Sequence, residues 1–143
     1  MSFSSYIADA LLNWMRGTAF PGAPAFLYFS LHSASPGMTG ANECTDATYA
    51  RVAIAATGAS FSAPANGGAG RRTTSSVDIT WPALTAGFTC SHVGFWDTLS
   101  GGNFVKGEAL AAPIAFTAGE APTISAGSFT DTRSEEHTSE LQS

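Results

Sequence analysis

The feature that most constrains the fold is a change in the spacing of apolar residues at Gly17. Before this residue, apolar side chains recur every three to four positions, at Tyr6, Ile7, Ala10, Leu11, Trp14 and Met15. This spacing places them on one face of a helix, which we expect over residues 3–16 with Ser2 or Ser4 as its N-cap. Arg16 suits the negative end of the helix dipole, and glycine commonly follows a helix end. The chain is therefore predicted to open with one amphipathic helix.

After Gly17 the apolar spacing becomes two, which is typical of strands. In residues 25–32, Leu27, Phe29 and Leu31 share one face, and Tyr28, Ser30 and His32 share the other. Weaker strands are expected at residues 51–57 and 60–62, and further strands at 73–81, 89–97, 103–110, 113–117 and 122–125. Residues 89–97 and 103–110 form the clearest expected hairpin, and residues 128–132 are expected only to begin a last strand. Residues 33–48 are expected to form a long polar loop, and the glycine-rich residues 63–70 a mobile one.

Seven or eight short strands with turn signals every eight to twelve residues predict a mainly β fold. We expect an antiparallel β-sandwich, or jelly-roll-like arrangement, over residues 18–132, preceded by the helical segment 1–17. The edges of an isolated sandwich invite pairing with neighbouring chains. The small number of charged side chains, 12% of the chain, suits packing into a larger assembly.

Composition and charge exclude several classes of protein. Apolar residues make up 44% of the 143 residues, which is enough for a core, and the formal net charge is −5. A nucleic-acid partner is not expected, because such a protein needs a basic surface to neutralise phosphates. No run approaches the roughly 18–20 apolar residues of a membrane span. The first fourteen residues also lack the basic start and cleavage site of a secretory signal, so we expect synthesis in a cytoplasm.

The last eleven residues, 133–143 (RSEEHTSELQS), differ from the rest of the chain in their density of charge. The same string results when a common short-read sequencing adapter is translated in one frame. We expect this segment to be non-native, produced by adapter read-through in a metagenomic assembly; the alternative is an ordinary polar tail. His137 and the three glutamates of the segment are therefore left out of every predicted site.

No catalytic constellation is evident. A Gly-x-Ser-x-Gly elbow is absent, and the alternation of a strand is expected to point the adjacent side chains of Ser91 and His92 apart. The glycines of residues 67–70 lack the lysine and the strand–helix context of a phosphate-binding loop. Asp78, Asp97 and Glu108 are candidates for glycoside hydrolysis by residue type only. We therefore predict that the chain is not an enzyme.

Metal and cofactor sites are also not predicted. His32 and His92 could join Asp97 or Glu43 at a divalent ion, but hydrogen-bonded strand histidines are the simpler interpretation. Two cysteines, Cys44 and Cys90, are too few for a disulfide framework or a zinc site. In a reducing compartment we expect both to be free thiols.

Two sets of apolar residues are candidates for binding. Most aromatic side chains, including Trp81, Phe95 and Phe104, are expected in the core, but Tyr28 or Trp96 could reach the surface and stack on a sugar. The helix face formed by Tyr6, Ile7, Leu11 and Trp14 has two open uses. It packs either on the sandwich of its own chain or on neighbouring helices around a symmetry axis, because so short a helix is marginal alone.

Several short segments, in this order, resemble a family of small structural proteins of tailed-phage virions that includes tail-fibre and head-fibre proteins. The resemblance covers residues 4–129 and is carried by its opening helix (4–16) and by RGTAF (16–20), LYFSLHS (27–33), PGMTGANE (36–43), YAR (49–51), ITWPA (79–83), HVGFWD (92–97), GGN (101–103), AGE (118–120) and TISAG (123–127). No segment is a mechanistic motif by itself; the specificity lies in their order. The pattern of the family closes with a strand, where this chain has the adapter-like string.

The resemblance implies a virion component of the fibre, tail or neck, made in the cytoplasm of a bacterial host, without catalytic residues or cofactors. Its implied partners are further copies of the same chain and other virion proteins, and by analogy with phage fibres we expect three-fold symmetry. The alternative is a carbohydrate-binding module for host-surface glycans. An enzyme, such as a glycan depolymerase, is a distant third.

Overall fold

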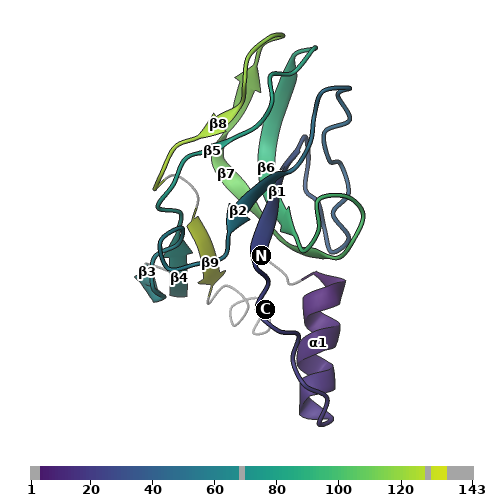
Figure 1. Ribbon diagram of the computed structural model, residues 1–143, viewed down its shortest axis with the longest axis vertical. Helices are drawn as coiled ribbons and strands as arrows, with labels where there is room; N and C mark the ends of the chain where they lie inside the picture. The colour runs from purple at the N-terminus through teal and green to yellow at the C-terminus, as the bar shows by residue number, and fades with distance from the viewer. Residues whose placement is uncertain (1–3, 68–69, 128–129, 135–143) are drawn as a thin grey trace, which may run out of the picture.

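A four-stranded antiparallel sheet forms the centre of the computed structural model, which describes residues 4–67, 70–127 and 130–134 (Figure 1). Its strands are β1 (Phe26–His32), β2 (Val52–Ala55), β6 (Phe88–Trp96) and β7 (Phe104–Phe116), in the order β2-β1-β6-β7. A three-stranded sheet has the order β3-β4-β9, from β3 (Ala65–Gly67), β4 (Gly70–Thr74) and β9 (Thr130–Ser134), and β5 (Ile79–Thr80) pairs with β8 (Thr123–Ile124). The predicted mainly β, antiparallel fold with one N-terminal helix is confirmed.

Helix α1 (Ser5–Met15) begins at Ser4, whose hydroxyl accepts a hydrogen bond from the backbone N–H of Ile7 at 3.2 Å. It ends where predicted: Arg16 is its C-cap, and Gly17 has a φ of +89°, a conformation that glycine adopts without strain. The helix extends away from the central sheet, and the chain then returns along it (Figure 1). No helix of the described residues is long and apolar enough to cross a membrane.

Both faces of the central sheet are covered. On one face, β1 and β6 contribute Phe29, Leu31, Val93 and Phe95, and the β5–β8 side of the molecule contributes Ile79, Trp81, Leu84 and Ile124 to the same apolar core. The Trp81 indole N–H donates to the backbone carbonyl of Phe29 at 3.0 Å and so ties this layer to β1. On the other face lie Ser30, His32 and Trp96, which are also buried. A sandwich with one irregular layer results.

The irregular layer is residues 33–44, called the cover loop from here on. Its ends are held next to each other because Ser33 N–H donates to the Asn42 carbonyl and Cys44 N–H donates to that of Leu31. Within it, Gly40 N–H and Ala41 N–H both donate to the carbonyl of Pro36. The predicted loop is therefore present, but it is a folded cover for the sheet.

Two predictions between residues 63 and 81 are wrong. Residues 63–70 were expected to be a mobile loop, but they contain β3 and the start of β4, which pair with Ala65 opposite Arg72. Residues 68 and 69 of this prediction lie outside the described residues. Residues 73–81, expected to be one strand, are divided between β4 and β5. After Thr74 the chain turns to the segment before β3, because Ser75 bridges Phe61 and Ser76 N–H donates to the Ser60 carbonyl.

Strand β7 replaces two predicted strands, 103–110 and 113–117, and it forms an edge of the central sheet. Its pairing with β6 is interrupted: His92 pairs with Ala109 and Cys90 with Ile114, so residues 110–113 lie opposite Ser91 alone. Pro113 falls within this bulge. Strand β9, predicted at residues 128–132, pairs with β4 and includes residues 133 and 134 of the segment that we expect to be non-native.

Candidate functional site

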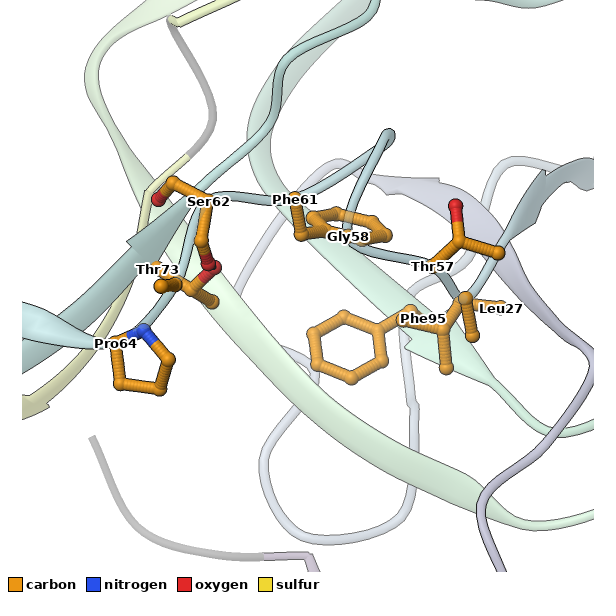
Figure 2. Close-up of a pocket in the computed structure, with 10 residues that line it drawn as sticks. Leu27, Thr57, Gly58, Phe61, Ser62, Pro64, Thr73 and Phe95 are labelled. Atoms are coloured by element: carbon orange, nitrogen blue, oxygen red, sulfur yellow. The ribbon is translucent and has the colours of Figure 1, made fainter.

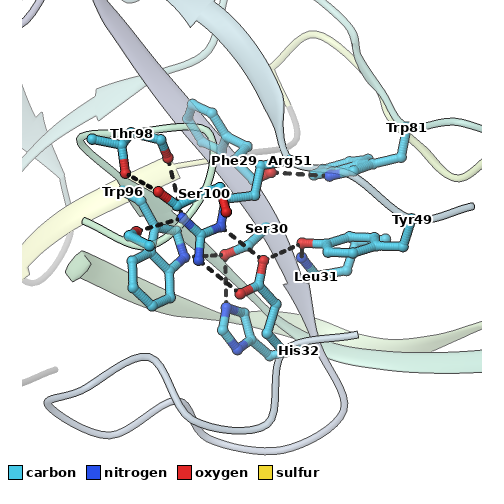
Figure 3. Close-up of polar contacts among 12 residues, drawn as sticks. Phe29, Ser30, Leu31, His32, Tyr49, Arg51, Trp81, Trp96, Thr98 and Ser100 are labelled. Carbon is cyan, nitrogen blue, oxygen red and sulfur yellow. Dashed lines mark hydrogen bonds and ion pairs between the residues drawn. The ribbon is translucent and has the colours of Figure 1, made fainter. Parts of the chain in front are cut away.

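The most developed arrangement of polar side chains lies between the central sheet and the cover loop (Figure 3). We call it the polar cluster, and its members are Ser30, His32, Glu43, Tyr49, Arg51 and Trp96. Strand β1 supplies Ser30 and His32, β6 supplies Trp96, the cover loop supplies Glu43, and the segment before β2 supplies Tyr49 and Arg51. Groups that are distant in the sequence therefore meet on the face of β1 that was expected to be polar.

The hydrogen bonds of His32 define its protonation state. The Trp96 indole N–H donates to the Ser30 hydroxyl oxygen at 3.0 Å, and that hydroxyl lies 2.7 Å from His32 Nε2. His32 Nδ1 lies 2.8 Å from the Ala41 carbonyl oxygen, which only accepts, so Nδ1 carries the proton and Nε2 accepts from Ser30. Burial lowers the pKa of His32, although the bond to Ala41 opposes this effect. The neutral imidazole satisfies every polar atom of this group.

All three guanidinium nitrogens of Arg51 donate hydrogen bonds. Its Nε and Nη2 donate to the two carboxylate oxygens of Glu43 at 2.9 and 3.0 Å, and its Nη1 donates to the carbonyls of Thr98 and Gly101 at 3.1 and 2.8 Å. Its guanidinium carbon lies 3.7 Å from the ring centroid of Trp96, a cation–π arrangement. Arg51 thereby joins the cover loop, β6 and the β6–β7 turn.

The same contacts set the pKa values of the two acidic members. Burial raises the pKa of Glu43, but hydrogen bonds from Arg51 and from the Tyr49 hydroxyl outweigh this effect and hold it below its ordinary value. Burial and the bond to Glu43 raise the pKa of Tyr49. Glu43 is therefore a carboxylate at neutral pH.

Asp46 forms a second polar junction just beyond the cover loop. Its carboxylate accepts hydrogen bonds from the backbone N–H groups of Thr48, Thr85 and Ala86 and from both threonine hydroxyls. Bonds from the backbone N–H groups of Thr48 and Thr85 hold the pKa of Asp46 well below its ordinary value. This carboxylate connects two loops and has its acceptor positions occupied by protein donors.

The described residues contain two serine–histidine pairs, and one of them contradicts a prediction. Ser91 and His92 were expected to point apart, but Ser91 Oγ lies 2.8 Å from His92 Nδ1. The prediction is wrong because the register shift between Cys90 and His92 breaks the alternation of β6 at this point. The other pair, Ser30–His32, is fully buried, so no substrate could reach it. The described residues hold no group of three or more potential metal ligands.

The acidic candidates for hydrolysis have structural partners. Asp78 accepts from the backbone N–H of Ala126, Asp97 accepts from the backbone and side-chain amides of Asn103, and Glu108 pairs with the buried Lys106 at 2.7 Å. These bonds hold turns and one strand edge in place. Cys44 and Cys90 are free thiols, as predicted, and both are buried.

The two glycan-stacking candidates differ in exposure. Trp96 is only 8% exposed, and Arg51 lies over its ring, so the structure removes it from the candidates for a surface contact. Tyr28 is half-buried, and its ring centroid lies 6.4 Å from that of Phe26, which is 45% exposed. The glycan-stacking role of Tyr28 remains a prediction.

The predicted assembly face of α1 is divided along its length. Tyr6 and Ile7, in the first half, are half-buried, and Tyr6 shares a shallow hollow with Ala10 of the helix and Pro21 of the returning segment. Leu11 and Trp14, in the second half, are exposed together with Leu12 and Met15. The role of this face in assembly remains a prediction.

An open hollow of about 590 Å³ lies on the core side of the central sheet, where β1, β4, β6 and residues 56–64 meet (Figure 2). Leu27, Phe61 and Phe95 supply its apolar surface, and Thr57, Ser62 and Thr73 supply hydroxyls. None of its lining residues carries a charge. It therefore offers shape and apolar surface, without groups for acid–base chemistry.

The sequence contained one signal for the polar cluster that our predictions did not use. Glu43 and Arg51 are charged residues in a chain with few of them, and each follows turn residues close to the strongest strand. Their pairing depends on how the cover loop folds over the sheet, which apolar spacing does not reveal.

The arrangement described above holds loops to strands, since its charged groups are occupied by hydrogen bonds and an ion pair, and this agrees with comparison to known proteins. A family model described as "Podophage GP4 fiber I protein gp80" matches residues 2–132, from α1 through β8 and into β9. No curated protein matches the chain. The predicted resemblance to tailed-phage structural proteins is thus confirmed over nearly the whole chain: it belongs to the podophage GP4 fiber I protein gp80 family and is a phage fibre protein, a structural component of the virion.

Proposed function

We propose that the chain is a fibre subunit that assembles as a homo-oligomer, with three-fold symmetry, through the second half of α1. Its family supports a structural role in the virion. The contact between copies is supported by one observation, the exposed apolar surface of α1. Leu11, Leu12, Trp14 and Met15 are 41%, 58%, 60% and 73% exposed.

The spacing of these residues explains why they form one surface. Leu11, Trp14 and Met15 stand at positions i, i+3 and i+4, which are neighbours on a helix, and Leu12 lies three residues before Met15. Scattered exposed apolar residues need no explanation, but a contiguous set on one element marks an interaction site. A helix of 11 residues also gains its stability mainly from packing, so a partner for this half would stabilise it.

Two leucines with nearly equal exposure allow a matched test. Leu12, on α1, is 58% exposed, and Leu99, in the β6–β7 turn, is 56% exposed. Light scattering of the wild-type chain should give a multiple of 14.7 kDa, three-fold if the symmetry is as proposed. Leu12→Glu should give the monomer, while Leu99→Glu should keep the assembly. A wild-type monomer at high concentration, or equal assembly of the two variants, would refute the proposal.

A second candidate function is binding of a host-surface glycan, favoured by the pair Phe26 and Tyr28. Their rings are tilted by 48° to each other, and their cross-strand partners on β2 are the small residues Ala55 and Ala53. The apolar face of a sugar ring stacks on the face of an exposed aromatic ring such as that of Phe26. An array of bacterial polysaccharides tests the candidate. Binding should be lost in Phe26→Ala and retained in Phe20→Ala, whose ring is 46% exposed; an array without signal would exclude it.

A further inference from the structure

The exposed apolar end of α1 and the apolar hollow lie on opposite faces of the central sheet. The helix tip is the set of exposed apolar side chains in the second half of α1, namely Leu11, Leu12, Trp14 and Met15. The base of α1 is on the cover-loop face, since the backbone N–H of Ser5 donates to the carbonyl of Met38 at 3.0 Å. The hollow is on the core face, where Leu27 and Phe95 line it (Figure 2). Because α1 also extends away from the sheet, the helix tip cannot enter the hollow of its own chain (Figure 1).

Backbone hydrogen bonds hold one wall of the hollow in place. Residues 56–64 form this wall as they join β2 to β3. Ala56 N–H donates to the Ala25 carbonyl at 2.9 Å, which fixes the start of the wall beside β1. Ser62 N–H donates to the Thr74 carbonyl at 2.9 Å, which fixes its other end beside β4. The hollow is therefore formed before an occupant arrives, and binding does not have to order it.

The lining of the hollow favours an apolar occupant. The Phe61 ring stacks on that of Phe29, with the ring centroids 6.0 Å apart. Two hydroxyls of the lining are engaged with the backbone: Thr73 Oγ1 donates to the Ser62 carbonyl, and Ser62 Oγ accepts from the N–H of Thr74. The described residues that line the hollow carry no charge. A charged occupant would therefore lose its contacts with water without gaining a partner of opposite charge.

The helix tip matches the hollow in character and in size. Its four side chains are uncharged, and Trp14, which is 60% exposed, is the largest of them. Since a cavity of about 150 Å³ holds one benzene ring, the hollow of about 590 Å³ has room for an indole ring and a leucine side chain together. Tryptophan is also enriched among the residues that contribute most to binding at the centre of an interface.

Three-fold symmetry requires two different contact surfaces on each subunit. Only a two-fold axis brings a surface against its own copy, whereas each subunit of a ring of three meets its two neighbours through different surfaces. The helix tip is one such surface in the proposed function. The hollow, which is apolar and lies on the opposite face of the sheet, supplies the second.

We propose that the helix tip of one copy docks in the hollow of the next copy, head to tail, with the Trp14 indole against Phe61 and Phe95. The inference rests on the proposed role of α1 in assembly and names the surface that α1 meets. Each subunit then uses one helix tip and one hollow, so that a closed ring leaves neither surface exposed to water.

Gly58 allows the hollow to be blocked without disturbing the fold. It lines the hollow, and a β-carbon there would meet no atom of the described residues within 4 Å. Gly58→Glu should weaken association by about a hundredfold or more, because docking would bury a carboxylate without a partner. Light scattering should then give the 14.7 kDa monomer.

Gly87→Glu is the matched control for the added charge. Gly87 lies just before β6, at the end opposite Phe95, and its new β-carbon would make only an ordinary contact, 3.5 Å from the Phe116 carbonyl oxygen. This variant should assemble as the wild type does. Dissociation of Gly87→Glu to the same extent as Gly58→Glu would overturn the docking, because the effect would then not depend on the hollow.

A mixture of two variants tests whether the contact is head to tail. Leu12→Glu loses the helix tip but keeps the hollow, and Gly58→Glu loses the hollow but keeps the helix tip. Mixed in equal amounts, they should form a complex of two chains, twice 14.7 kDa, and grow no further, because the remaining tip and hollow are both blocked. If each variant is monomeric and the mixture is monomeric too, the docking is overturned.

The same measurements separate the docking from the role of α1. If Leu12→Glu is monomeric but Gly58→Glu assembles as the wild type does, α1 acts through another surface, and only the docking is overturned. If Leu12→Glu assembles, the role of α1 in assembly is refuted, and the docking with it. If Gly58→Glu does not fold, hydrogen exchange of the wild-type assembly is compared with that of Leu12→Glu. The amides of Ser60 and Phe61 should be better protected in the assembly, and a difference confined to α1 would overturn the docking.

Discussion

Arg51 should contribute more to stability than any other charged side chain of the polar cluster, and Arg51→Leu tests this. The change removes both hydrogen bonds to Glu43, both bonds to the β6–β7 turn and the contact with Trp96. Removing one partner of a buried ion pair destabilises a protein by about 3–5 kcal/mol. Glu43 keeps its bond from Tyr49 and its side chain is 20% exposed, so we expect the lower end, about 3 kcal/mol.

Urea unfolding followed by tryptophan fluorescence measures this loss. With a slope of about 2 kcal/mol per molar urea for a domain of this size, the midpoint should fall by about 1.5 M. Arg72→Leu is the control, because Arg72 is exposed on β4, and it should shift stability by less than about 0.5 kcal/mol. Arg51→Lys keeps the charge but loses the bidentate hydrogen bonding to Glu43, so its urea midpoint should lie between those of Arg51→Leu and Arg72→Leu.

The pH dependence gives an independent check on the cause. In the wild type, Glu43 has a lowered pKa, so its contribution is present at neutral pH and is lost as the pH falls through that value. In Arg51→Leu, burial should raise the pKa of Glu43, and the variant should gain stability relative to wild type as the carboxyl takes up a proton. The difference between the two should therefore shrink from pH 7 to pH 4. A midpoint shift below about 0.5 M, or a difference that does not change with pH, would refute this reasoning.

Three further predictions follow from the same structure. Gly40→Ala should destabilise the chain by about 2–4 kcal/mol in urea unfolding, because the new methyl group overlaps the Trp96 ring. Gly37→Ala is the control in the same loop: it has φ +59° and open space around it, so it should lose only about 1–2 kcal/mol from backbone strain. Equal losses of stability in the two variants would contradict the close contact between Gly40 and Trp96. A thiol reagent at pH 8 should label neither Cys44 nor Cys90 in the folded chain, because burial shields both thiols and raises their pKa. Both cysteines should be labelled in urea, and rapid labelling without urea would show that the core opens. Resequencing the gene should replace the string at residues 133–143, which lies just beyond the family match, and its recovery from independent clones would show that it is encoded.

Strands could be predicted where burial alternates along the chain in step with the sequence. Phe29, Leu31, Val93 and Phe95 face one core, so their spacing of two located β1 and β6 correctly. The spacing failed at Val77, Ile79 and Trp81, which continue the alternation although the chain leaves β4 at Thr74. Apolar spacing records which side chains are buried, and it does not record which strand they pair with.

The polar cluster could not be predicted for a related reason. Tyr28, Ser30 and His32 have the residue types of a solvent-facing row, but Ser30 and His32 are buried beneath the cover loop. Turn residues such as Pro36 and Gly40 predict that a chain bends, but the surface on which it then lies depends on tertiary contacts, here with Trp96 and Gly107. Trp96 was predicted as a possible surface residue for the same reason: the sequence does not show that the cover loop and Arg51 lie over its ring.

The bulge of β7 has a consequence for the way in which this chain can meet other chains. Strand β7 is 13 residues long and lies at a sheet edge, the geometry that most easily recruits a foreign strand. Residues 110–113 break its regular hydrogen-bonding repeat, and Pro113 has no N–H to offer. A foreign strand could therefore pair regularly with only part of this edge. We expect this irregularity to lower the tendency of β7 to pair with a strand of another chain.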